Sequence, residues 1–204
     1  MKFQHEIGGI YRLRVPFENL YTSVFLIKTN EENILVDTAT FPADVDMYIL
    51  PALKEMGLCL TDIKYLILTH KHDDHIGGKN RIVQLNSNIR INEQLPSSLS
   101  IYDLKGHTLD CIGVFERQTG TLISGDGLQG AGIGRYRCSL ENEEEYLKTI
   151  EKIQQDKRLE NLLFSHAYEP WYKDGVFGRE EINKCLQDCI NCMKGERNES
   201  NRNQ

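Results

Sequence analysis

The segment that most constrains this chain is His70-Lys71-His72-Asp73-Asp74-His75, which directly follows the apolar run Tyr65–Thr69. A short continuous apolar run is typical of a strand buried on both faces. Three imidazoles and two carboxylates therefore lie at a strand end, where functional side chains often gather. In extended backbone, residues two apart point the same way, so His70 and His72 can bind one metal ion. A turn after them would bring Asp74 and His75 towards a second ion.

Imidazole combined with carboxylate suits zinc, iron(II) or manganese. The alternative interpretation is a polar surface loop in which histidines happen to cluster, and the position at a strand end disfavours it.

Hydrophobic periodicity predicts a chain that is rich in strands until about residue 124 and helical afterwards. Three helices are expected, although Pro51 argues against one straight helix in the first of them: Ala43–Met56, Glu143–Lys157 and Arg179–Met193. Nine strands are expected: Ile7–Val15, Thr22–Lys28, Asn33–Val36, Tyr65–Thr69, Ile89–Asn92, Ser100–Leu104, Cys111–Glu116, Thr121–Ser124 and Asn161–Ser165.

The segment His70-x-His72-x-Asp74-His75 resembles the signature of the metallo-β-lactamase-fold superfamily. Four more family motifs follow in the family's order, and the resemblance covers roughly residues 5–170: Ile34–Thr38 with Asp37, Gly106-His107-Thr108, Leu122–Gly127 with Asp126, and Leu163–His166. Five of the six histidines fall in these motifs, and His5 is left as a surface or edge residue. The resemblance implies an α/β four-layer αβ/βα sandwich, with two mixed β-sheets flanked by helices and the site at one edge between the sheets. One domain is expected over residues 1–193, followed by a disordered polar tail, 194–204.

The resemblance also implies seven metal ligands and two divalent ions, with zinc expected and iron or manganese compatible. The first ion would be held by His70, His72 and His107. The second would be held by Asp74, His75 and His166, with Asp126 bridging the two. Asp37 is similar to a family residue that orients a ligand; a plain turn-forming residue is an equally weighted interpretation.

The implied chemistry is hydrolysis, in which a hydroxide between two metals attacks a small ester, thioester or lactone. Asp74 would also move a proton to the leaving group. His75 after Asp74 differs from the narrow group of β-lactamases, which use Cys for the second metal, and His72 replaces the Glu of flavodiiron proteins. The chain is more similar to the glyoxalase II and lactonase-like group. Only 38 residues (204 − 166) follow His166, so the helical domain with which glyoxalase II grips glutathione is not expected.

Two other functions stay open. Persulfide dioxygenases resemble glyoxalase II closely and use a single iron at the positions of His70, His107 and Asp126. A phosphodiesterase or nuclease is less favoured, because the net charge is 24 − 30 = −6 and no phosphate-binding domain is evident.

The sequence departs from the family in two places. Leu109-Asp110-Cys111 replaces the usual Pro-Gly after the Gly-His-Thr motif, which predicts a less rigid turn. The interval from His75 to His107 is 107 − 75 = 32 residues, which is short for the family.

Composition limits the setting and the partners. The sequence has no apolar run of 18 residues and no apolar leader at its start, so neither a membrane span nor a signal peptide is expected. Six cysteines without a leader indicate reduced thiols and a cytoplasmic protein. We expect a small-molecule substrate and neither nucleic acid nor membrane as a partner, and the chain is compatible with a homodimer.

Three other features were weighed. Cys185, Cys189 and Cys192 have the spacing of a radical-SAM iron–sulfur motif, but they share one helical face, which favours packing against the core. Cys111 is also expected in the core. The glycine-rich segment Gly127–Gly134 is expected to be a mobile rim of the site. Arg135, Tyr136 and Arg137 are expected to be solvated loop residues, with substrate contacts as the alternative. Tyr168, Trp171 and Tyr172 form an aromatic cluster that is compatible with a pocket wall or with a cap on the core.

Overall fold

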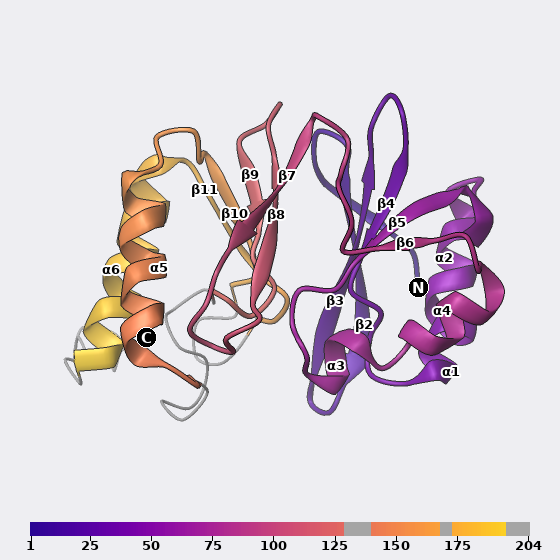
Figure 1. The fold of residues 1–204 in the computed structure, drawn as a ribbon, viewed down its shortest axis with the longest axis horizontal. Coiled ribbons are helices and arrows are strands. Elements are labelled where there is room, and N and C mark those ends of the chain that lie inside the picture. Colours follow the sequence, from indigo (N-terminus) through magenta and orange to yellow (C-terminus); the bar gives the residue numbers. More distant parts are fainter. Residues whose placement is uncertain (129–139, 168–172, 195–204) are drawn as a thin grey trace.

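The computed structural model of this chain describes residues 1–128, 140–167 and 173–194. Two β-sheets face each other, and helices cover the outer face of each sheet (Figure 1). The first sheet has the order β1-β2-β3-β4-β5-β6, and its strands are Gln4–Ile7, Ile10–Phe17, Leu20–Lys28, Asn33–Val36, Ile63–Ile67 and Arg90–Ile91. The second has the order β11-β10-β9-β8-β7, and its strands, from β7 to β11, are Leu99–Asp103, Ile112–Glu116, Thr121–Ile123, Asn161–Leu163 and Gly175–Phe177. Both sheets contain parallel and antiparallel pairs, so the predicted four-layer sandwich with two mixed sheets is confirmed.

Alternation along the central strands explains the layers. In β3, Phe25 and Ile27 point into the core between the two sheets, whereas Val24 and Leu26 point to the core beneath the helices. Successive side chains of a strand point to opposite faces, so a strand between two apolar layers must be apolar at every position. This accounts for the continuous apolar runs in the sequence.

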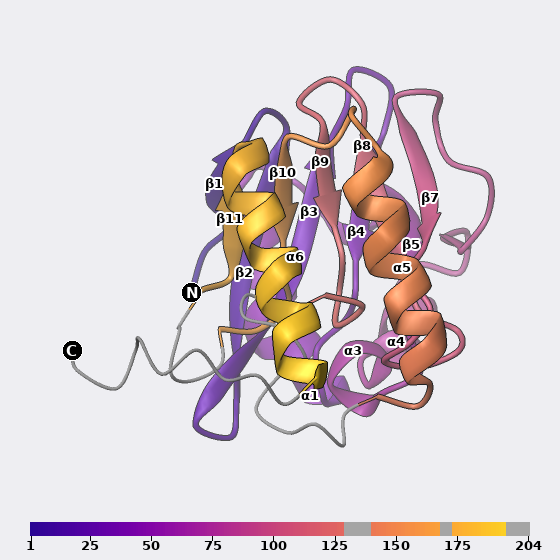
Figure 2. The same ribbon diagram turned by 90° about the vertical axis from the view of Figure 1, so that its left-hand side faces the viewer.

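Helices complete the outer layers. The first sheet is covered by a helical stretch, α1 (Pro42–Asp44), the π-turn Val45–Ile49 and α2 (Leu50–Glu55), and by α4 (Lys79–Leu85). The short helix α3 (Asp73–Ile76) lies at the edge of the sandwich (Figure 1). The second sheet is covered by α5 (Glu143–Gln155) and α6 (Arg179–Lys194), which lie side by side across it (Figure 2). The pairs β4–β5 and β9–β10 are parallel, so loops that leave their C-terminal ends gather at one edge of each sheet.

Two predicted elements need correction. The strand predicted at Ile7–Val15 is confirmed from Ile10 onward as β2, but it starts later than predicted, because the chain makes the β1–β2 hairpin turn at Gly8, whose φ is 53°, and Gly9. A Cβ on Gly9 would lie 2.2 Å from the Lys28 carbonyl oxygen, so only glycine allows this approach. The helix predicted at Ala43–Met56 is interrupted by the π-turn Val45–Ile49. Pro51 follows it in the first turn of α2, where a missing backbone N–H is tolerated.

The cysteine-rich face packs as expected where it is described. Cys185 and Cys189 of α6 and Cys111 before β8 are buried in the core under the second sheet. The Cys192 side chain lies outside the described residues, as does the predicted tail from residue 195 onward, while Lys194 still belongs to α6. None of the described helices combines the length and the apolar character needed to cross a bilayer.

Candidate functional site

Seven predicted ligands meet at the edge of the sandwich, on loops from both sheets. The segment after β5, which is a loop followed by α3, supplies four of them, the β7–β8 loop one, and the segments after β9 and β10 one each: His70, His72, Asp74, His75, His107, Asp126 and His166. Their donor atoms form three groups, each with its atoms within 4.8 Å of one another: His70, His72 and His107; His70, His75 and Asp126; Asp74, His75 and His166. The sequence-predicted side chains are therefore close together, which their separation along the chain did not guarantee.

The three-histidine group is tightly spaced. Nδ1 of His72 lies 3.0 Å from Nε2 of His70 and 3.0 Å from Nε2 of His107. The His72 ring stands nearly perpendicular to both other rings, at 80° and 82°. His70 and His107 are buried, whereas His72 is exposed. One ion at a typical zinc–nitrogen distance of about 2.0–2.1 Å fits among three nitrogens at this spacing.

Asp126 lies between the group of three histidines and the group of Asp74, His75 and His166. Its Oδ2 is 3.8 Å from Nε2 of His107, and its Oδ1 is 3.5 Å from Nε2 of His75 and 3.3 Å from Nε2 of His166. Oδ2 of Asp74 is 3.1 Å from the same His166 nitrogen. One carboxylate thus faces the three-histidine group with one oxygen and the other group with its second oxygen, the placement that a bridging ligand requires.

The donor set fits divalent metal. Among the described residues, the buried atoms His75 Nε2 and Asp126 Oδ1 make no hydrogen bond of acceptable geometry, although only 3.5 Å separates them. Buried polar atoms without hydrogen bonds are costly, and a shared cation would satisfy both. Imidazole nitrogens and carboxylate oxygens are also the donors that zinc, iron and manganese accept.

Burial and the neighbouring carboxylates together determine which imidazoles of the cluster are charged. Burial, reinforced by His75, lowers the pKa of His70 to about 2, so this imidazole is neutral and able to ligate. Burial also opposes the charge on His75 and His166, but carboxylates outweigh it. Asp37 and Asp126 raise the pKa of His75 well above its ordinary value, and Asp126 and Asp74 raise the pKa of His166 to about 9. Metal that binds these two imidazoles must therefore displace protons.

Asp37 contacts a ligand instead of joining the cluster. Its Oδ2 is 2.7 Å from Nδ1 of His75, and its Oδ1 accepts the Thr69 backbone N–H at 2.8 Å. The Thr69 hydroxyl also donates to Oδ2, at 2.8 Å. Asp37 has a φ of 62°, so it forms the turn after β4, and the same residue contacts Nδ1 of His75.

Glycines let α3 pack closely beneath the loop after β4. A Cβ on Gly77 would lie 1.7 Å from the Thr40 carbonyl oxygen, and one on Gly78 would lie 2.4 Å from that of Thr38. The His75 carbonyl accepts from both the backbone N–H and the hydroxyl of Thr38, at 2.8 Å each. The backbone around His75 is therefore fixed by its neighbours.

The turn after His107 does not depend on Pro-Gly. Thr108 Oγ1 and Cys111 Sγ are 3.1 Å apart, and Gly106 donates its backbone N–H to the Thr108 carbonyl at 3.2 Å. Glu141 adds a link that the sequence did not reveal, since it accepts from the Leu109 backbone N–H at 2.8 Å and pairs with Lys71 at 3.1 Å. The predicted loss of rigidity is offset by these contacts.

Several predicted features lie outside the described residues. They are the glycine-rich segment from residue 129 onward, with Arg135, Tyr136 and Arg137, and the aromatic cluster Tyr168, Trp171 and Tyr172. His5 is exposed on β1, an edge strand, as expected.

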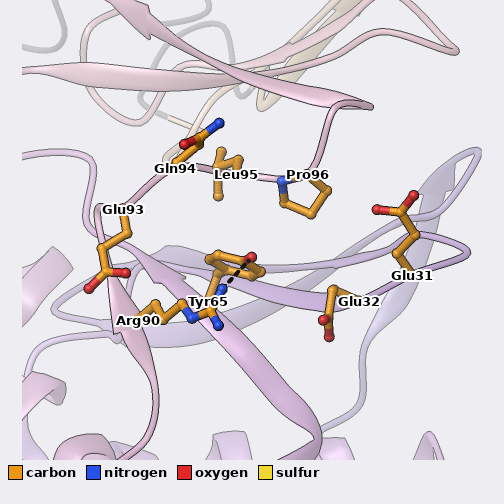
Figure 3. Close-up of a pocket in the computed structure, with 8 residues that line it drawn as sticks. All are labelled: Glu31, Glu32, Tyr65, Arg90, Glu93, Gln94, Leu95 and Pro96. Carbon is orange, nitrogen blue, oxygen red and sulfur yellow. Dashed lines mark hydrogen bonds between the residues drawn. The ribbon is translucent and has the colours of Figure 1, made fainter.

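A separate open pocket of about 440 Å³ contains none of the clustered ligands (Figure 3). It is lined by Glu31, Glu32, Tyr65, Arg90, Glu93, Gln94, Leu95 and Pro96. Arg90 Nη1 donates to the Tyr65 hydroxyl at 3.0 Å, so these two lining groups bond to each other (Figure 3). The pocket does not contribute to the His and Asp cluster.

Comparison with known proteins gives a family match and distant relatives. Residues 18–96 match the model described as the metallo-beta-lactamase superfamily. A beta-lactamase-like protein 2 homolog from Caenorhabditis elegans is 24% identical over 166 residues, which are 68% of this chain and 53% of that protein. A hydroxyacylglutathione hydrolase from Legionella pneumophila (strain Lens) is 26% identical over 156 residues, 62% of this chain and 61% of that protein. The chain thus spans between half and two thirds of these relatives' lengths.

Solved structures agree on the fold. A metallo-β-lactamase from Pseudomonas aeruginosa in its mono-zinc form superposes with a TM-score of 0.69 at 18% identity, covering 94% of this chain and 96% of that one. A metallo-β-lactamase from Erythrobacter litoralis gives 0.70 at 16% identity, covering 92% and 95%.

Proposed function

We propose that this chain is a binuclear metal-dependent hydrolase of small esters, thioesters or lactones. Its metallo-β-lactamase fold and its match to that superfamily's model over residues 18–96 support the proposal. The observation that carries the proposal is the position of Asp126. Its two carboxylate oxygens face two groups of donor atoms, which supports a site for two ions over a site for one.

The residues divide into two sets. One ion would be held by His70, His72 and His107, and the other by Asp74, His75 and His166, with Asp126 shared. Two divalent ions, zinc first among the candidates, would polarise the substrate carbonyl and lower the pKa of a bound water. Asp37 keeps Nε2 of His75 turned into the cluster by holding Nδ1, and the Tyr21 carbonyl does the same for His166 by accepting its Nδ1–H at 2.7 Å.

Asp74 is our candidate for proton transfer to the leaving group. Its side chain is 14% exposed, compared with 6% for Asp126, so it is the carboxylate that a substrate can reach more readily. Burial would raise the pKa of Asp74, but contacts with His166 and His75 outweigh it and hold the pKa far below its ordinary value. Asp74 therefore begins the reaction as a carboxylate. Because its pKa is low, it would hold a proton only transiently, as the proton passes from the bound water to the leaving group.

Relatives guide the choice of substrate class. Those named hydroxyacylglutathione hydrolase favour an acyl thioester as the first substrate to try. Specificity in any fold depends on its loops, so ester and lactone substrates belong in the same panel.

Metal content is the first test. We expect two equivalents per chain by elemental analysis, and we expect His70→Ala to lose metal and hydrolytic activity together. His5→Ala is the matched control, because His5 is an exposed histidine that contacts the Gly8 carbonyl and lies outside the cluster. A chain that binds no metal, or a His70→Ala variant that keeps its activity, would refute the proposal.

A substrate panel is the second test. Turnover of thioester, ester or lactone by the two-metal protein supports the hydrolase, and exclusive turnover of a phosphodiester contradicts the substrate class. One iron per chain together with oxygen uptake on a persulfide would replace hydrolysis with the dioxygenase function. Asp74→Ala separates two roles, since loss of one metal equivalent indicates ligation, whereas retained metal with slow turnover indicates proton transfer.

A further inference from the structure

An arginine side chain is completely buried where the two sheets meet. Arg12 on β2 exposes none of its surface, and its guanidinium lies over the Phe25 ring at 4.7 Å. Two carboxylates balance its charge, since Nη1 is 3.0 Å from Asp174 Oδ2 and Nε is 2.9 Å from Glu6 Oε1. Taking a charged group out of water is costly, so this arrangement needs compensating interactions.

Those interactions reach across to the second sheet. Arg12 Nη1 donates to the Phe164 carbonyl at 2.9 Å, and Nη2 donates to the Asp174 carbonyl at 2.7 Å. Phe164 itself donates its backbone N–H to the Asp174 carbonyl at 2.9 Å. Arg12 thus binds the chain at the point where β10 has ended and β11 has not yet begun.

The two residues after Phe164 are also held from the first sheet. The Ser23 hydroxyl donates to the Ser165 carbonyl at 2.7 Å, and His166 Nδ1 donates to the Tyr21 carbonyl at 2.7 Å. Three consecutive residues, the last of which is a ligand, are therefore bound by the antiparallel pair β2–β3. Arg12 Nη1 also lies 3.3 Å from the Ser23 hydroxyl, which links two of these contacts.

We propose that Arg12 is a positioning residue that fixes His166 and, through it, the second metal group. Arginine suits this role because its planar fork donates to two carbonyls and a carboxylate at once, whereas lysine has a single ammonium. Only the metal part of the proposal rests on the proposed function. The clamp on Phe164–His166 exists without any ligand.

Hydrogen exchange of the metal-free protein tests the clamp directly. We expect Arg12→Met to speed exchange in residues 164–167 by about tenfold, because the opened segment loses its cross-sheet hydrogen bonds. Arg14→Met is the matched control. Arg14 pairs with the same two acids, at 3.2 Å for Glu6 and 2.6 Å for Asp174, but it is 32% exposed. Among the described residues of the β10–β11 connection, its hydrogen bonds go to the Asp174 side chain and not to residues 164–167. Equal acceleration in both variants would overturn the proposal, because loss of charge alone would then explain it.

Zinc titration by calorimetry tests the consequence for the site. We expect Arg12→Met to weaken zinc binding at the group of Asp74, His75 and His166, the second equivalent, by about tenfold. Binding at the three-histidine group, the first equivalent, should be unchanged, and Arg14→Met should resemble wild type. Equal weakening of both equivalents would contradict a role through His166. If Arg12→Met does not fold, Arg12→Lys and Ser23→Ala replace it, with the same selective loss expected. A wild-type chain that binds no second zinc refutes the binuclear function alone, and the exchange data still decide the clamp.

Discussion

Oδ2 of Asp37 lies 2.7 Å from Nδ1 of His75, on the far side of the imidazole from the cluster. A carboxylate in this position holds the ring orientation and makes the opposite nitrogen more basic. We therefore expect Asp37→Asn to weaken binding at the group of Asp74, His75 and His166 by about 10–100-fold. Zinc titration with elemental analysis measures this, and the three-histidine group should keep its affinity.

Asp73→Asn is the control for that variant, because Asp73 lies in the same motif but is exposed. If Asp37→Asn binds the second zinc as tightly as wild type, or if Asp73→Asn weakens it equally, then Asp37 does not act through His75.

Metal removal should lower thermal stability by an amount that reports occupancy. A ligand at 100 times its dissociation constant stabilises the folded state by about 2.7 kcal/mol. For a domain of this size each kcal/mol raises Tm by about 2–4 °C, so chelation should lower Tm by roughly 5–11 °C for each metal lost. Scanning calorimetry with and without chelator measures the shift. His5→Ala should show the full shift and His70→Ala a reduced one; a shift that is the same in both would place the metal elsewhere.

Most of the sandwich and its ligand set could be predicted because the signals are local. Asn33–Val36 was predicted with the strand bounds that the structure has, since its apolar run is bounded by polar residues. The clustered His and Asp side chains could be picked out because they occur as motifs at strand ends. Asp126 and His107 are close together only through the fold, and the resemblance placed them there.

The supporting contacts could not be predicted, because they join positions far apart in the sequence. Arg12 and Phe164 are 152 residues apart, and Lys71 and Glu141 are 70 apart. An arginine in a strand pattern predicts an outward, solvated side chain. Arg12 points inward instead, because two carboxylates and two carbonyl oxygens bind its guanidinium there. Short elements such as α3 and β11 have too few residues for a periodicity to show.

Thiol labelling tests the packing of α6. Cys59 is exposed, whereas Cys111, Cys185 and Cys189 are buried. Burial raises the pKa of Cys111 to about 12, which removes the reactive thiolate at neutral pH. With iodoacetamide and peptide mapping, we expect Cys59 to react in the native protein and the other three only after unfolding. Native labelling of Cys185 or Cys189 at the rate of Cys59 would show that this face does not pack as described.

Gly77→Ala should damage stability and metal binding together. Gly77 has an ordinary helical φ of −60°, so its requirement is space: a Cβ would meet the Thr40 carbonyl oxygen at 1.7 Å. We expect a loss of about 1–3 kcal/mol in the free energy of unfolding, with weaker zinc binding because α3 carries His75.

Gly57→Ala offers the contrast. Its φ is +73° but no heavy atom lies within 4 Å of an added Cβ, so the cost is backbone strain of about 1–2 kcal/mol, remote from the ligands. Urea denaturation and zinc titration of both variants distinguish the two effects. Weakened zinc binding in Gly57→Ala would mean that global stability, not the position of α3, controls the site.

Acid stability should depend on Asp174. Burial would raise the pKa of its carboxyl, but Arg12, the Tyr21 hydroxyl and Arg14 outweigh burial and hold the pKa below its ordinary value. A carboxyl whose pKa is lower in the folded than in the unfolded state stabilises the protein fully above the unfolded value, about 3.9, and this contribution is lost as pH falls through the folded value. Urea denaturation between about pH 2 and pH 6 should therefore show a flatter stability curve for Asp174→Asn than for wild type, with a difference in slope of at most about 1.4 kcal/mol per pH unit. Asp103→Asn, at a carboxylate that is 55% exposed, should run parallel to wild type. Parallel curves for wild type and Asp174→Asn would mean that the Arg12 cluster does not favour the ionised form of Asp174.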